Sequence, residues 1–191
     1  MNRLETASIL LSLTDRLKEH GSWAGETHVQ KAAYILKTVL GVPLDFDFIL
    51  YKHGPFSFDL RSELGSLRAE GLMAWDIQGR PYGPSLKAGP LGEALKTQFS
   101  YAPQEYQNQI DFVALKLGGK DVKALERFAT AIFVTLERET SRSDRVAWIH
   151  RIKPHVSLPQ AETAVQEADA FLVEVQAMGA LPASRCLAHS C

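Results

Sequence analysis

The sequence predicts a mainly helical α+β protein, with a winged-helix-like N-terminal half that carries a small antiparallel sheet and a helical C-terminal half. Apolar residues recur at helical spacing through the first 40 residues and again after about residue 90. Between these regions, apolar and polar residues alternate as they do in strands. With 191 residues, of which 46% are hydrophobic, the chain is long enough to bury a substantial core.

Two helices are expected at the N-terminal end. The first runs from about Leu4 to Glu19, because one stripe of it is apolar. The second follows Thr27, which has capping-box spacing with Gln30. Gly41 and Pro43 are typical stop signals for this second helix.

The stretch from residue 45 to 77 organises the rest of the prediction. A strand is expected over 46–53, and Gly54-Pro55 should end it with a rigid turn, because proline has no amide hydrogen to donate to a ladder. Ser57 is a good cap for a third helix, which Gly71 ends by supplying a left-handed residue.

A strand over 72–77, a turn over 78–81 and a returning strand over 82–86 should follow. A helix and then a strand pair resemble the recognition helix and wing of a winged-helix domain. The first strand departs from that topology, because it follows the second helix and not the first. Glycine and proline residues then predict a linker near 86–90.

The expected domains are therefore 1–88, winged-helix-like, and 89–180, a helical domain packed on it, with a flexible tail over 181–191. The helical part should contain helices over 91–99 and 104–117. It should also contain three helices that begin at caps, which are Asp121, Ser143 and the capping box of Ser157 with Gln160.

Two short motifs resemble a known family. Gln30-Lys31 leads a helix that contains Tyr34, the run from Lys52 to Ser57 reads KHGPFS, and Gly71-Leu72 closes the following helix. The run from Ile152 to Ser157, IKPHVS, enters the last helix. These pieces look like those of the bacterial YwgA-like proteins and, more distantly, of the Panacea-type antitoxin domain, over roughly residues 5 to 175.

The resemblance implies a function in toxin–antitoxin or phage-defence systems. Domains of this kind neutralise a toxin by direct contact, in some cases by occupying its nucleic-acid site. The family supplies no known catalytic residue, so the resemblance implies none here.

Catalytic and metal-binding chemistry find little support in the sequence. His53, Gly54 and Pro55 are interpreted as a structural turn, because no serine or cysteine stands in a nucleophile-elbow setting. His150 and His155 are one residue too far apart for two ligands on one helical face. We therefore expect no catalytic residue, no metal site and no cofactor.

A nucleic-acid interface is the main alternative. Its candidates are Arg61 and Arg68 on the third helix, Arg80 in the wing, and Arg142 and Arg145 in a later basic stripe. The third helix also carries three acids, and a net charge of −1 gives no basic field to attract phosphates. DNA binding by a winged-helix transcriptional regulator is thus disfavoured and stays the second hypothesis.

A protein-binding surface is the leading hypothesis. Asp45, Asp47, Asp59 and Glu63 lie on the strand and the helix that meet at Gly54-Pro55, so they could present carboxylates to a basic partner such as a toxin. The nearby aromatic residues are either core residues or an exposed patch of the kind found at interfaces. The other interpretation of the four acids is a set of scattered solubilising charges.

The expected location is the cytoplasm, without membrane contact. No apolar run approaches the roughly 20 residues that span a bilayer. The only cysteines, Cys186 and Cys191, lie in the last few residues, and a core without cysteine is typical of a reducing compartment.

Overall fold

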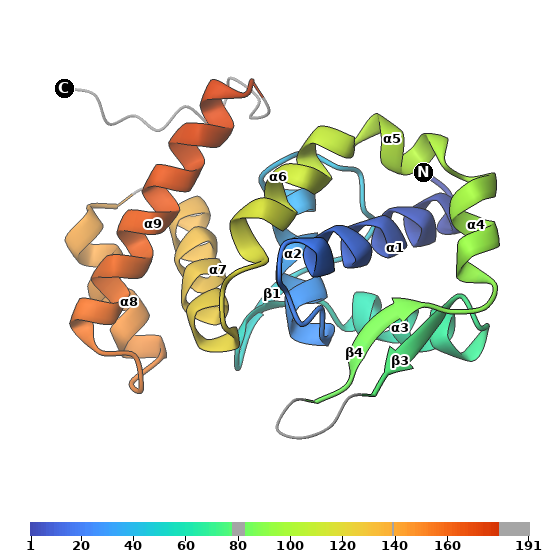
Figure 1. Cartoon of the computed structure of the whole chain (residues 1–191). Helices are drawn as coiled ribbons and strands as arrows, with labels where there is room; N and C mark the ends of the chain where they lie inside the picture. Colours follow the sequence, from blue (N-terminus) through green and yellow to red (C-terminus); the bar gives the residue numbers. More distant parts are fainter. Residues whose placement is uncertain (78–82, 139, 180–191) are drawn as a thin grey trace.

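Residues 1–77, 83–138 and 140–179 are described by the structure, a computed structural model of the chain. Helices dominate and the strands pair as two separate antiparallel hairpins, which confirms the predicted mainly helical α+β class (Figure 1). The helices are α1 (Arg3–Glu19), α2 (Glu26–Thr38), α3 (Phe58–Ala69), α4 (Gly92–Gln98), α5 (Tyr101–Glu105), α6 (Gln107–Leu117), α7 (Val122–Glu137), α8 (Arg142–Ile152) and α9 (Leu158–Ala177). The strands are β1 (Ile49–Tyr51), β2 (Gly54–Phe56), β3 (Met73–Asp76) and β4 (Ser85–Ala88).

The helices form two groups that meet at α2 and the first hairpin. Helix α1 packs against α4, α5 and α6, whereas α7, α8 and α9 pack against one another at the other end of the molecule (Figure 1). Both α2 and β2 contact α7 and so connect the two groups. The expected boundary near residue 88 does not coincide with a gap in this packing, and the division into two domains stays a prediction.

The linker expected over 86–90 is instead a tightly packed strand end. Leu86 is fully buried in β4, and the chain at Gly89 passes so close to the end of α3 that a Cβ there would lie 2.3 Å from the carbonyl oxygen of Gly71. The linker prediction is therefore wrong, because Gly89 serves this close approach and not flexibility.

Most of the predicted helix starts are confirmed. The Ser57 hydroxyl accepts from the amide of Leu60, Asp121 caps α7, and Ser157 with Gln160 forms a complete capping box at α9. Two predictions are wrong. The cap of α8 is Ser141 and not Ser143, and α2 begins after Gly25 without a side-chain cap.

The first strand is shorter than predicted, and Gly54-Pro55 does not end it. Residues Gly54 and Pro55 belong to β2, in which Pro55 lies opposite Leu50. The turn is at Lys52-His53 instead. Proline is tolerated because each strand of a two-stranded sheet is an edge strand, whose outer side needs no ladder partner.

Helix α3 and the hairpin β3–β4 follow the order of a recognition helix and its wing. The register pairs Met73 with Ala88 and Asp76 with Ser85, so the returning strand begins later than the predicted residue 82. The predicted turn over 78–81 lies outside the described residues. Strand β1 pairs with β2 and does not join this hairpin, which is a further departure from winged-helix topology.

Candidate functional site

The hairpin β1–β2 is the centre of the candidate site, and its geometry requires glycine at position 54. Gly54 has a φ of +91°, in the region that L-residues with side chains rarely adopt. A Cβ there would lie 2.9 Å from Thr130 Oγ1 and 3.3 Å from the carbonyl oxygen of Glu126, both in α7. The expected structural turn at His53, Gly54 and Pro55 is therefore also a contact point with α7.

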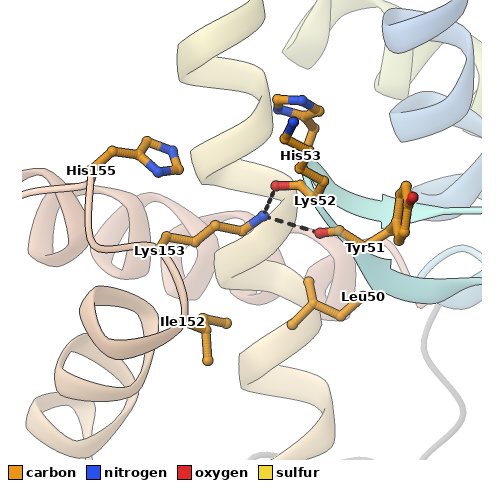
Figure 2. Close-up of a pocket in the computed structure, with 7 residues that line it drawn as sticks. All are labelled: Leu50, Tyr51, Lys52, His53, Ile152, Lys153 and His155. Atoms are coloured by element: carbon orange, nitrogen blue, oxygen red, sulfur yellow. Dashed lines mark hydrogen bonds between the residues drawn. The ribbon is translucent and has the colours of Figure 1, made fainter.

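Two buried lysines hold the hairpin in place. Lys31 of α2, whose side chain is fully enclosed, donates to the carbonyl oxygen of Pro55 at 2.8 Å. Lys153, after α8, donates to the carbonyl oxygens of Tyr51, at 3.1 Å, and Lys52 (Figure 2). Each ammonium thus donates to backbone carbonyl groups of the hairpin, which offsets part of the cost of burying its charge.

Gln30, for which the sequence predicted a capping box, fixes the start of α3 directly after the hairpin. Its amide nitrogen donates to the carbonyl oxygen of Ser57 at 2.9 Å, and its oxygen accepts from the amide of Ser57 at 3.0 Å. Gln30 is fully buried, so this pair of bonds satisfies both ends of its side chain. The capping box of Thr27 and Gln30 is absent because Gln30 faces the start of α3 instead.

Burial lowers the pKa of both Lys31 and Lys153. Removal from water lowers the pKa of Lys31 to about 8, the nearby Glu126 opposes this change, and the charge of Lys153 adds to it. Burial also lowers the pKa of Lys153, again against the influence of Glu126. Burial therefore favours the neutral form of both lysines more strongly than water does.

We expect the buried Lys31 to make stability rise with pH. Between about 8 and 10.5 the unfolded chain binds more protons at Lys31 than the folded chain, so the free energy of unfolding increases with pH in this window. Relative to Lys31→Met, the wild type should gain up to about 3 kcal/mol over this range, at 1.36 kcal/mol per pKa unit. Urea unfolding at several pH values measures this difference.

The matched control for Lys31→Met is Lys37→Met on the same helix, where the side chain is partly exposed. Its unfolding free energy should follow that of the wild type across the same pH range. A constant difference between wild type and Lys31→Met from pH 7.5 to 10.5 would contradict a lowered pKa for Lys31.

The outer face of the hairpin presents a group of apolar side chains, which we call the aromatic patch: Ile49, Tyr51, Phe56 and Phe58. Ile49, Tyr51 and Phe58 are each about half exposed. The ring centroids of Tyr51, Phe56 and Phe58 lie 5.1 to 5.8 Å apart, the spacing of a mutually packed aromatic cluster. The sequence left open whether the aromatic residues belong to the core or form an exposed patch. Tyr51 and Phe58 are exposed.

Three of the four acidic candidates are exposed near this patch. Burial alternates from Val42 to Tyr51, which places Asp45 and Asp47 outward with Ile49 and Tyr51. Asp59 is exposed beside Phe58 on α3. Lys37 approaches Asp47 at 3.7 Å, but that carboxylate is almost fully exposed.

Glu63 does not join this acidic rim. Its carboxylate accepts a hydrogen bond from Arg3 of α1 at 3.1 Å and is only 17% exposed, so it ties α3 to α1. Glu63 and Glu70 share the charge of Arg3, so Glu63 is less accessible to a partner than the three aspartates, and its part in partner binding stays a prediction.

The basic candidates on α3 and in the wing are not assembled into one described surface. Arg61 is well exposed and lies 3.8 Å from Glu26. Arg68 stacks on the ring of Trp75, 4.2 Å from its centroid. Arg80 lies outside the described residues.

The later basic stripe is mostly engaged in intramolecular contacts. Arg145, only 9% exposed, donates to Asp169 at 2.6 Å and to Thr135 at 2.7 Å. Arg142, which lies at the surface, donates to the same carboxylate at 3.1 Å. Arg145 is therefore a structural residue and unavailable to a phosphate, which corrects its place among the nucleic-acid candidates.

A cleft opens on the inner side of the hairpin, toward α7 and the α8–α9 loop. His53 Nδ1 lies 3.3 Å from a carboxylate oxygen of Glu126. His155 lies on the same side of Lys153 as His53, and Leu50 and Ile152 lie on the opposite side (Figure 2). The sequence identified His53 and His155 only as unlikely catalytic or metal-binding residues, and the structure brings them to one cavity.

Sequence reasoning missed Lys31 and Glu126 altogether. The available signal for Lys31 was a charged residue within the apolar stripe of α2, between Gln30 and Ala32. Such a residue is rarely enclosed unless it has a specific partner. That partner, a carbonyl in a distant hairpin, is visible only in the tertiary structure.

No protein-family model and no curated protein sequence matches the chain. Within the described residues, no group of three or more histidine, cysteine, aspartate or glutamate side chains is arranged to hold a metal ion. In the same part of the chain, none of the helices is both long enough and apolar enough to cross a membrane. The expected tail with Cys186 and Cys191 lies outside the described residues.

Proposed function

We propose that this chain is a non-enzymatic protein-interaction module of antitoxin or phage-defence type, which acts in the cytoplasm and neutralises or regulates a partner by direct contact. The observation that carries the proposal is the aromatic patch on the outer face of the hairpin. Exposed clusters of large apolar side chains are typical of protein interfaces, and aromatic residues supply much of the binding energy there.

The support beneath the patch suits a binding surface. Lys31 and Lys153 bond to the hairpin from α2 and from the α8–α9 loop, Gln30 bonds to Ser57 directly after it, and Gly54 packs against α7. A surface held in this way loses little conformational freedom when a partner binds, which leaves more of the contact energy as affinity.

The acidic rim indicates the chemistry of the partner. Asp45, Asp47 and Asp59 are exposed and close in sequence to residues of the patch, so a partner with a basic border beside an apolar contact would be complementary. The nucleic-acid site of a toxin has such a border, which agrees with the function implied by the resemblance to Panacea-type antitoxins.

The alternative, a DNA-binding transcriptional regulator, has less support. Arg68, Arg142 and Arg145 are engaged by Trp75 or Asp169. Of the described candidates, Arg61 is the most exposed, and one arginine neutralises too few phosphates for stable duplex binding.

The test compares two double variants for binding to a partner recovered from the host and then purified. We expect Tyr51→Ala with Phe58→Ala to weaken the purified complex by about 100-fold, because two central aromatic side chains are removed. Leu115→Ala with Val173→Ala removes equally exposed apolar side chains from α6 and α9 and should leave the affinity unchanged. Isothermal titration calorimetry measures both.

Charge reversal at the rim provides an independent measurement. Asp47→Lys with Asp59→Lys should slow association and reverse its salt dependence, and thermal melting should show an intact fold. Equal partner affinity for the wild type and the Tyr51/Phe58 double variant would show that the patch is not the binding surface. Tight, salt-sensitive binding of duplex DNA would favour the alternative.

A further inference from the structure

The inner cleft collects basic side chains from several elements of the fold. A cavity of about 400 Å³ is lined by the basic side chains His53, Lys123, Arg127, Lys153 and His155 together with one carboxylate, Glu126. The whole chain has a net charge of −1, so this concentration is local. The basic residues come from the hairpin, α7 and the α8–α9 loop, which are brought together only by folding.

The cations of the cleft differ from most others on the surface. Arg16, Lys96 and Lys120 each contact a carboxylate within 3 Å. By contrast, the side chains of Lys123, Arg127 and His155 have no ion pair or hydrogen bond within the described part of the chain. Lys153 donates only to carbonyl oxygens, and Glu126 is already beside His53. The carboxylate of Asp121 acts on Lys123 and Arg127 only at longer range, so both side chains are able to pair with a bound anion.

A second cavity adjoins the first and gives the cleft an apolar end. It measures about 660 Å³ and shares His53, Lys153 and His155 with the first cavity. Leu50, Tyr51 and Ile152 are among its other lining residues (Figure 2). A ligand that fills both cavities would place an apolar group against Leu50 and Ile152 and negative charge toward Lys123 and Arg127. Volumes of this size suit a small molecule and exclude a nucleic-acid duplex.

We propose that this cleft binds a nucleoside polyphosphate, with its phosphates between Lys123, Arg127 and Lys153 and its base against Leu50 and Ile152. Lysine and arginine are the side chains that bind phosphate groups most effectively, and several of them are needed for a polyanion. This site borders the proposed partner surface, because Tyr51 of the aromatic patch also lines the cavity that contains Leu50 and Ile152.

The experiment titrates the purified full chain with ATP, GTP and pyrophosphate and follows binding by calorimetry. We expect a nucleoside triphosphate to bind at least about tenfold more tightly than pyrophosphate, because only the nucleotide occupies the apolar end. Arg127→Gln with Lys123→Gln should weaken nucleotide binding by about 100-fold, since two charged contacts are lost. Both residues lie at the surface of α7, and the melting temperature should hardly change.

The control is Arg61→Gln with Lys116→Gln, which removes the same number of charges from α3 and α6. Nucleotide binding that survives in this control and is lost in the α7 variant supports the cleft as the site. An equal loss in both variants overturns it, as does the absence of binding to every nucleotide at 1 mM. Pyrophosphate binding as tight as that of ATP overturns the assignment to nucleotides.

Discussion

Gly54→Ala is expected to lower the free energy of unfolding by about 3 kcal/mol. Adopting a φ of +91° costs an alanine about 1 kcal/mol or more, and inserting a methyl group into a packed contact costs about 1 to 3 kcal/mol. The new Cβ would meet Thr130 Oγ1 at 2.9 Å, and Thr130 is itself buried and bonded to the carbonyl oxygen of Glu126. The hairpin would therefore have to move away from α7, and denaturant unfolding measures the cost.

Two comparisons separate the causes of this loss. Gly41 has a φ of +72° but open space around its Cβ position, so Gly41→Ala should cost only the backbone part, about 1 kcal/mol. In a Thr130→Ala background, Gly54→Ala should cost about 1 kcal/mol less than in the wild type, because its closest clash is gone. Equal costs at positions 54 and 41 would show that the contact with α7 is not tight.

Asp169→Ala is expected to destabilise the protein by about 3 kcal/mol. The Asp169 carboxylate binds both terminal nitrogens of Arg145, at 2.6 and 3.2 Å, and the guanidinium is nearly enclosed between α7, α8 and α9. Among the described residues, removing the carboxylate leaves this buried positive charge with the Thr135 hydroxyl as its remaining side-chain partner. An uncompensated buried charge of this kind typically costs about 3 to 5 kcal/mol.

Arg142 supplies the matched control, because it binds the same carboxylate from an exposed position. Arg142→Ala should cost no more than about 1 kcal/mol, as exposed ion pairs usually do. Replacing both charged partners, in Arg145→Met with Asp169→Leu, should restore much of the stability lost in Asp169→Ala. A small effect of Asp169→Ala, comparable with that of Arg142→Ala, would mean that Arg145 is not effectively buried.

The two faces of the hairpin connect these stability predictions to function. Its outer side carries the aromatic patch and its inner side lines the cleft, and the contact at Gly54 fixes both relative to α7. A variant that shifts the hairpin should therefore weaken both proposed activities, whereas variants confined to Phe58 or Arg127 should affect one activity each.

The sequence by itself determined the helical architecture and most of its ends. The apolar stripe of α3, the caps at Ser57, Asp121 and Ser157, and the positive φ at Gly71 depend on residues within a few positions of one another. Local hydrogen bonds and periodicity decide such features, so a single sequence is enough to predict them.

Only the tertiary structure decided what the polar residues do. Gln30 has the spacing of a capping box but binds Ser57, 27 residues away, and Arg145 lies in a basic stripe but is buried against Asp169. Lys31 and Lys153 reach the same hairpin from positions 122 residues apart. A polar side chain takes its role from the nearest partner in space, and that partner is set by chain packing and not by local spacing.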